Sequence, residues 1–292
     1  MRLRELLKHE LPAEELSQVR NSFDIIGSIC IVELPPPLSA YYTLICSKIL
    51  NKNRKVKTIL NKHQSKHYGA LRQLNLTYLH GEETFETVHT EDGIRLLLNV
   101  SQCYFSVRSL TERRRIASLL KSPEAVLVMF SGIGGFLAHL YKTGLLFKGV
   151  GIELNPDSVR CSLETLKLNN ITNASIVEGD VESYITQSRV KEILPVFDRI
   201  VAPIPHTCYC LDNVPESFEF NDFIDSILKF AKKKTIIHLY FFGTRKAVDI
   251  YINNKLTQKV QQFGFNLKIL NIIKCGNIAP KIHRFCLDFE LN

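Results

Sequence analysis

Long apolar runs are missing from this chain of 292 residues. No stretch reaches the roughly 18 apolar residues that cross a bilayer, and the first 16 residues read as a helix of mixed charge with no signal-peptide core. We therefore expect a cytoplasmic protein without a membrane segment, with a nuclear or organellar pool left open. Because 45% of the residues are hydrophobic, the chain can still bury a sizeable core.

Cysteine pairs at metal-site spacing are also absent. The eight cysteines are scattered, no CxxC pair occurs, and Cys208 and Cys210 stand too close together for a standard zinc half-site. We interpret the cysteines as reduced structural thiols and predict no metal site.

Acidic residues are missing from one long segment, between Lys48 and Glu82, in a chain of net charge +8. Such a stretch is a candidate phosphate-contacting surface, because each neutralised phosphate releases counterions. A solvated basic face fits the charge equally well. The cations in this segment are Lys48, Lys52, Arg54, Lys55, Lys57, Lys62, Lys66 and Arg72.

Two halves with different apolar patterns divide the chain, which exceeds one typical domain of about 100 to 200 residues. Residues 1–105 mix short strand-like runs with a helical segment and predict a small α+β domain. In residues 106–292, strand-like runs alternate with helical segments, which is typical of a Rossmann-like α/β domain with a mostly parallel, doubly wound sheet. Ligands bind at the carboxyl ends of such strands.

The first strand of the second half ends in the glycine-rich segment FSGIGGF, residues 130–136. Its glycines let the backbone turn tightly and approach a ligand closely. A dinucleotide fingerprint requires a third glycine where Leu137 stands, so a nicotinamide site is poorly supported. Glu153 and Asp180 end the next two strands, where carboxylates accept hydrogen bonds from ribose hydroxyls. This combination favours S-adenosylmethionine, an adenosyl ligand without a pyrophosphate, over ordinary loop chemistry.

Longer segments resemble one enzyme family. The chain contains, in this order, SFDIIGSICIVELP, ETVHTEDGIRLLLNVSQCYFSVRSLTER, FSGIGGF, GIELNPDSVRCSLETLKLNN and IIHLYFF. Together they resemble the tRNA methyltransferases that modify N1 of guanosine 37, beside the anticodon. The resemblance implies a class I methyltransferase domain at 106–292 and a preceding tRNA-contacting domain at 1–105. It also implies S-adenosylmethionine as cofactor, the tRNA anticodon stem-loop as partner, and a monomer.

The resemblance assigns roles around the YFSVRSLTER segment. It implies that Glu112 is the general base on guanine N1 and that Arg72 helps to hold O6, with Arg108 and Arg113 as associated arginines. Guanine N1 carries a proton that a carboxylate within reach can remove, and a fixed guanidinium stabilises the charge that builds on O6. From the residues alone, Arg108 and Glu112 could instead form a surface ion pair one helical turn apart. Tyr104 could be a half-buried strand aromatic instead of a residue beside a flipped base.

Two positions depart from the family pattern. Val128 replaces the Asp of the family's DMFAGIG segment, and PIP replaces NLP at the end of the fourth strand. Pro205 keeps the family proline, whereas Pro203 has no side-chain amide, so it can shape the pocket but cannot hydrogen-bond the base. A lost bidentate amide costs about 1 to 3 kcal/mol of discrimination between bases.

These departures leave two alternatives to methyl transfer. One is the related aminocarboxypropyl transferase of wybutosine synthesis, and the other is a catalytically reduced tRNA-binding protein of the same fold. The candidate catalytic residues are Glu112, Arg72, Arg108, Tyr104 and Pro203. The candidate cofactor contacts are Ser131, Gly132, Gly134, Glu153, Asp180 and Arg108.

Overall fold

The structure is a computed structural model that describes residues 2–63, 69, 71–181, 196–204 and 221–292. Four residues discussed above lie outside this part of the chain, namely Lys66, Pro205, Cys208 and Cys210. Within the described ranges, no helix combines the length and the apolar character needed to cross a bilayer. The described cysteines are all free thiols, and most of them are buried.

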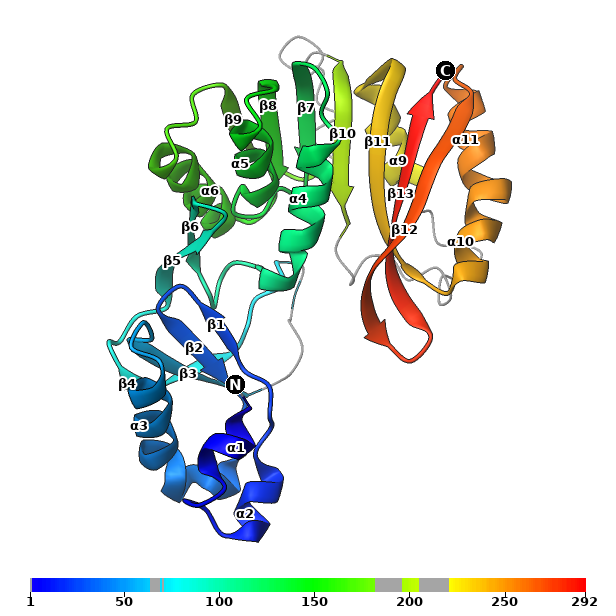
Figure 1. Ribbon diagram of the computed structural model, residues 1–292. Helices are drawn as coiled ribbons and strands as arrows, with labels where there is room; N and C mark the ends of the chain where they lie inside the picture. Colours follow the sequence, from blue (N-terminus) through cyan, green and yellow to red (C-terminus); the bar gives the residue numbers. More distant parts are fainter. Residues whose placement is uncertain (1, 64–68, 70, 182–195, 205–220) are drawn as a thin grey trace.

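The amino-terminal unit is a four-stranded sheet with the order β1-β2-β3-β4, covered by short helices (Figure 1). The expected helix of residues 1–16 is in fact two helices, because Pro12 interrupts the chain and α2 begins after it. The strands β2 and β3 are parallel, and the other two pairs are antiparallel. The elements are α1(Leu3–Leu7), α2(Ala13–Gln18), β1(Asp24–Ile26), β2(Ile29–Val32), η1(Pro36–Tyr41), α3(Tyr42–Lys52), β3(Thr58–Lys62) and β4(Leu76–Gly81).

A separate hairpin, β5(Glu86–Glu91) and β6(Ile94–Asn99), contacts both units of the chain. On one side Ser28 N, in the turn between β1 and β2, donates to Thr87 Oγ1 of β5 at 3.0 Å. On the other side Leu97 N donates to Thr165 Oγ1 at 3.1 Å in α6 (Pro156–Leu168). The predicted domain boundary at residue 105 stays a prediction, since the hairpin that precedes it is bonded to both units.

The carboxy-terminal unit is a seven-stranded sheet with the order β12-β13-β11-β10-β7-β8-β9. The five strands from β11 to β9 are parallel, and β13 and β12 complete the sheet in antiparallel pairing. This confirms the predicted mostly parallel α/β sheet. The strands are β7(Glu124–Met129), β8(Leu146–Glu153), β9(Ala174–Glu178), β10(Phe197–Pro203), β11(Ala231–Gly243), β12(Leu267–Ala279) and β13(Ile282–Leu291).

Helices pack on both faces of this sheet, so that one apolar core lies on each face. One core joins the sheet to α9, α10 and α11, and the other joins it to α4 and α5. Val128 is fully buried in the second core, so it packs between sheet and helices, and it is not among the residues that line the pocket described below. The remaining elements are η2(Val107–Ser109), α4(Leu110–Ser118), α5(Gly135–Lys142), α9(Asn221–Lys229), α10(Arg245–Tyr251), η3(Ile252–Leu256) and α11(Thr257–Gln262).

Candidate functional site

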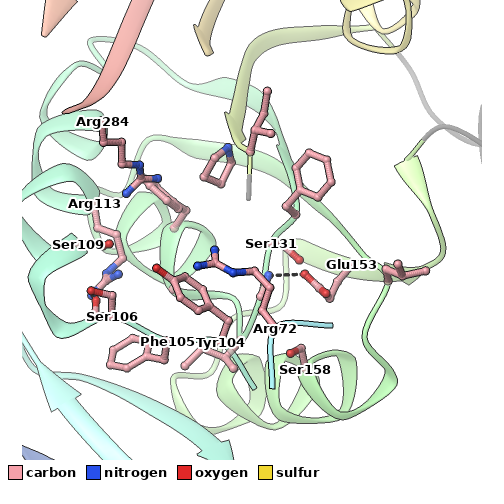
Figure 2. Close-up of a pocket in the computed structure, with 18 of the residues that line it drawn as sticks. Arg72, Tyr104, Phe105, Ser106, Ser109, Arg113, Ser131, Glu153, Ser158 and Arg284 are labelled. Carbon is pink, nitrogen blue, oxygen red and sulfur yellow. Dashed lines mark hydrogen bonds between the residues drawn. The ribbon is translucent and has the colours of Figure 1, made fainter. Parts of the chain in front are cut away.

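A pocket of about 530 Å³ opens at the carboxyl ends of the parallel strands, where the sequence predicts ligand chemistry. One part is formed by the loops after β7, β8, β9 and β10, and the opposite part by the segment before α4 and by the β12–β13 hairpin. Figure 2 shows labelled side chains from the segment before α4, from the loop after β7, from the end of β8 and from β13 around one space. The predicted site residues that line it are Arg72, Tyr104, Arg108, Ser131, Gly132, Glu153, Asp180 and Pro203.

The glycine loop after β7 needs glycine at two positions. Gly132 has a φ of +56° and Gly134 a φ of +81°, in the region that L residues rarely adopt. A Cβ at Gly134 would lie 2.6 Å from Ser162 Oγ in α6. Gly134 itself is not among the residues that line the pocket, so its contribution is to hold the loop against α6.

Glu153 at the end of β8 is fixed by the backbone around it. Its carboxylate accepts hydrogen bonds from Gly132 N at 2.7 Å and from Asn155 N at 2.9 Å. Burial raises the pKa of Glu153, and these backbone donors oppose the rise. These backbone donors leave part of the acceptor capacity of a carboxylate unused, so Glu153 can still accept a hydrogen bond from a ribose hydroxyl. Asp180, after β9, lines the same pocket.

Arg72 and Tyr104 form a stacked pair in the pocket (Figure 2). The guanidinium carbon of Arg72 lies 3.7 Å from the centre of the Tyr104 ring, and Arg72 adopts a φ of +56°. Non-glycine residues in this conformation cost free energy and cluster at functional sites. Arg108 lies in η2 with an exposed side chain, and its Nη2 is 3.4 Å from Asp24 Oδ1.

Glu112 lies outside the set of residues that line the pocket. It is only 4% exposed, and its carboxylate accepts hydrogen bonds from Tyr240 Oη at 2.9 Å and from Arg115 Nε at 3.0 Å. The alternative of a surface ion pair between Arg108 and Glu112 is therefore wrong, because each has another partner. Its role as a general base stays a prediction.

Arg113 follows Glu112 on α4 and anchors this helix to β5. It is 5% exposed, and its Nε and Nη2 donate to the two carboxylate oxygens of Glu91 at 2.6 and 2.7 Å. Its guanidinium carbon also lies 5.2 Å from the centre of the Phe105 ring, and both side chains line the pocket. A bidentate pair of this kind fixes geometry as well as charge.

A buried polar network joins β10, β11, β13 and α4, and no local pattern in the sequence predicts it. Arg199 donates to Glu124 Oε2 at 2.6 Å and contacts His238 Nε2 at 2.6 Å. His238 Nδ1 lies 2.6 Å from Asp288 Oδ1, and Arg115 donates to the other oxygen of Asp288 at 2.6 Å. Because an arginine is always a donor, His238 Nε2 accepts and its Nδ1–H donates.

The pKa values of this network follow from burial and pairing. Burial lowers the pKa of His238, so the ring is neutral. Burial by itself would raise the pKa of Asp288, but bonds from His238 and Arg115 outweigh it and hold this pKa at about 2. His238, Cys286 and Asp288 have their ligand atoms within 4.8 Å of one another. Both ring nitrogens and the carboxylate are already engaged by these bonds, so the cluster is a hydrogen-bonded network that disfavours an added cation.

The predicted basic surface of the amino-terminal unit is partly neutralised. Lys48 is bonded to Glu10, and Lys57 Nζ lies 3.4 Å from Glu82 Oε1. Both acidic residues lie outside the acid-free segment of the sequence, so the fold brings in charges that the segment itself lacks.

Profiles of known families match most of the chain in two adjoining parts. The profile of the TRM5/TYW2 methyltransferase domain matches residues 87–268. The profile of the TYW2 N-terminal domain matches residues 3–84.

Similar proteins of known name fall into two groups. The tRNA (guanine(37)-N(1))-methyltransferase Trm5b of Pyrococcus abyssi is 29% identical over 97% of this chain and 78% of its own length. The tRNA(Phe) (4-demethylwyosine(37)-C(7)) aminocarboxypropyltransferase of Pyrococcus horikoshii is 28% identical over 99% of this chain and 96% of its own length. The crystal structure of P. horikoshii TYW2 in complex with MeSAdo superposes with a TM-score of 0.73 at 26% identity, covering 99% of this chain and 97% of that one.

Proposed function

Because the chain belongs to the TRM5/TYW2 methyltransferase family, we propose that it transfers the methyl group of S-adenosylmethionine to N1 of guanosine 37 in tRNA. The observation that carries this proposal is the arrangement of the pocket. A carboxylate bonded to the glycine loop, Glu153, and a stacked arginine–tyrosine pair, Arg72 and Tyr104, line one cavity at the ends of the parallel strands.

The cofactor side of the pocket is the part around β7, β8 and β9. Gly132 and Glu153 are bonded to each other there, and Asp180 lies at the end of the next strand. Carboxylates at these strand ends suit ribose hydroxyls. S-adenosylmethionine supplies an activated methyl group when bound. The similar P. horikoshii structure holds MeSAdo, which supports an adenosyl ligand at this place.

The acceptor side is formed by Tyr104, Arg72 and Pro203. A nucleoside must leave its base stack to reach such a pocket, and an aromatic ring that stacks on it repays part of that cost. As the proton leaves N1, negative charge spreads to O6, where a guanidinium held in place stabilises it. Arg72 is suited to this by its stacked position on Tyr104.

The proposed base is Glu112. Its neighbour Arg113 and, one helical turn earlier, Ser109 line the pocket, while its own carboxylate is bonded to Tyr240 and Arg115. Removal of the N1 proton therefore requires that the carboxylate exchange one of these bonds and turn toward the pocket when tRNA is bound. Catalytic hydrogen bonds commonly tighten only in the substrate complex.

Aminocarboxypropyl transfer is the second candidate, and specific observations favour it. Pro203 places a ring without an amide at the end of β10, inside the pocket. The amino-terminal unit matches the TYW2 N-terminal domain, and the aminocarboxypropyltransferase relative is covered almost completely by this chain. Catalytic loss is less well supported, because Val128 packs in the core and does not line this pocket.

Two labels on the cofactor distinguish these functions. Unmodified tRNA with guanosine 37 and tRNA with 4-demethylwyosine 37 are each incubated with S-adenosylmethionine labelled in the methyl group or in the carboxyl group. We expect methyl label on the guanosine substrate and none on a tRNA with adenosine 37. Carboxyl label on the 4-demethylwyosine substrate alone would establish the second function. Tight tRNA binding without either label would establish a binding protein.

A further inference from the structure

The distal half of the β12–β13 hairpin forms a wall of the pocket to which the proposed reaction assigns no role. Cys275, Gly276 and Asn277 of β12 and Arg284 of β13 line the pocket. The register of the two strands shifts between Lys274 and Gly276, and Gly276 pairs with Arg284. Such a bulge bends a strand and redirects side chains, and bulges are common next to active sites. Figure 1 shows this end of the hairpin extending beyond the rest of the sheet.

Arg284 is held in place by a buried ring. Its guanidinium carbon lies 4.5 Å from the centre of the Tyr240 ring, and Tyr240 is completely buried with its hydroxyl donating to Glu112. The stacked position fixes the plane of the guanidinium without using its N–H groups. In Figure 2 the Arg284 side chain lies at the edge of the pocket near Arg113.

The donors of Arg284 are not used within the described part of the chain. No carboxylate of the described residues lies within ion-pair distance of it, and its Nε is buried without a hydrogen-bond partner. A buried donor without a partner is unfavourable, because it has lost its hydrogen bonds to water. Two other arginines in the pocket are compensated, since Arg113 is bonded to Glu91 and Arg108 faces Asp24. Arg284 therefore brings a positive charge that an anionic ligand can neutralise.

The order of the strands places Arg284 away from the cofactor side. Glu153 ends β8 on one side of β10, whereas Arg284 lies on β13, two strands from β10 on the other side. Pro203 stands at the end of β10 between them. The acceptor side thus includes Arg284, and the anions of an RNA acceptor are its phosphodiesters. The planar fork of a guanidinium matches two phosphate oxygens.

We propose that Arg284 binds a backbone phosphate of the RNA beside the target nucleoside, so that the β12–β13 hairpin is an RNA-contacting wall in addition to the Arg72–Tyr104 pair. This inference rests on the proposed function, because it takes tRNA as the substrate. It assigns Arg284 to the binding and placement of the nucleoside and leaves proton transfer to other groups.

Arg284→Gln tests the inference directly. We expect the Kd for tRNA to rise roughly tenfold, as for a lost hydrogen bond to a charged group. We also expect the slope of log Kd against log salt to fall by about 0.7 to 0.9, the loss of one phosphate contact. Filter binding between 50 and 200 mM salt, about the range over which such contacts weaken strongly, measures both. Lys268→Gln is the matched control. It removes one positive charge from the same hairpin, and Lys268 pairs with Glu290 away from the pocket.

Calorimetry measures the affinity of each variant for S-adenosylmethionine, and thermal unfolding shows whether the variant is folded. If Arg284→Gln is unstable, Arg284→Lys is tested in its place. Arg284→Lys should keep the salt slope and lose part of the affinity for tRNA. Weaker cofactor binding with unchanged tRNA binding would assign the guanidinium to the cofactor and overturn the inference. Unchanged tRNA affinity and slope in a folded variant would overturn it while leaving the proposed function intact. Failure of the unaltered protein to bind tRNA would overturn both.

Discussion

On the proposed function, residues at the acceptor side select the base, and Pro203 is the one most open to test. Pro203→Asn adds an amide at the end of β10, where Pro203 lines the pocket. Because a bidentate amide contact to a base is worth about 1 to 3 kcal/mol, we expect kcat/KM for methyl transfer to guanosine 37 to rise roughly tenfold over that of the unaltered protein. Pro203→Ala, which removes the ring without adding an amide, should not raise it. Equal kcat/KM values for the two variants would contradict an acceptor-side role for this position.

The second test at this scale concerns Glu112. Glu112→Gln keeps the size of the side chain and an acceptor for the Tyr240 hydroxyl, but it removes the basic oxygen. We expect turnover at saturating cofactor and tRNA to fall about a hundredfold or more, with tRNA affinity unchanged. Tyr240→Phe is the control, because it removes the hydrogen bond and keeps the carboxylate. If both variants lose turnover equally, Glu112 acts by supporting the fold and not as the base.

Among the elements, α4 depends on one buried ion pair for its attachment to β5. Arg113→Met leaves the Glu91 carboxylate buried without its partner, which is expected to cost about 3 to 5 kcal/mol of unfolding free energy. Urea denaturation measures this loss. Arg114→Met is the matched control on the same helix, since Arg114 pairs with Asp92 at an exposed position and such pairs contribute little to stability. Similar losses for the two variants would show that burial of the Arg113 pair does not matter.

Elements and strand-end residues were predictable for a local reason. Strand-like apolar runs and the glycines after β7 are patterns of neighbouring residues. The strands β7, β8 and β10 and the positions of Gly132 and Glu153 therefore follow from the sequence. The partners of Glu112 do not, because Tyr240 is 128 positions away. Arg284 was missed for the same reason, since its significance comes from a ring on another strand and from a missing carboxylate partner.

At the scale of the whole molecule, the network of Arg199, His238, Asp288 and Arg115 joins β10, β11, β13 and α4. The pKa of Asp288 is lowered from 3.8 to about 2, so its contribution to stability is complete above pH 4 and is lost as the pH falls toward 2. The lowered pKa of His238 acts in the same direction, from about pH 6.5 downward.

Unfolding free energies at neutral and acidic pH test this coupling. We expect stability to decrease as the pH falls, with Asp288 accounting for up to about 2 kcal/mol below pH 4. Asp288→Asn should be less stable at pH 7 and flatter with pH below 4. A profile below pH 4 as steep as that of the unaltered protein would show that other carboxylates cause the acid sensitivity.

The hairpin of β5 and β6 has a consequence for accuracy. Its hydrogen bonds from Ser28 to Thr87 and from Leu97 to Thr165 tie the basic amino-terminal unit to the helix that supports the glycine loop. On the proposed function, the hairpin then fixes the distance between the amino-terminal unit, which contacts the tRNA stem, and the reacting methyl group. A chain with a loosened hairpin would still perform its chemistry, but it would begin to mark the nucleosides on either side of position 37.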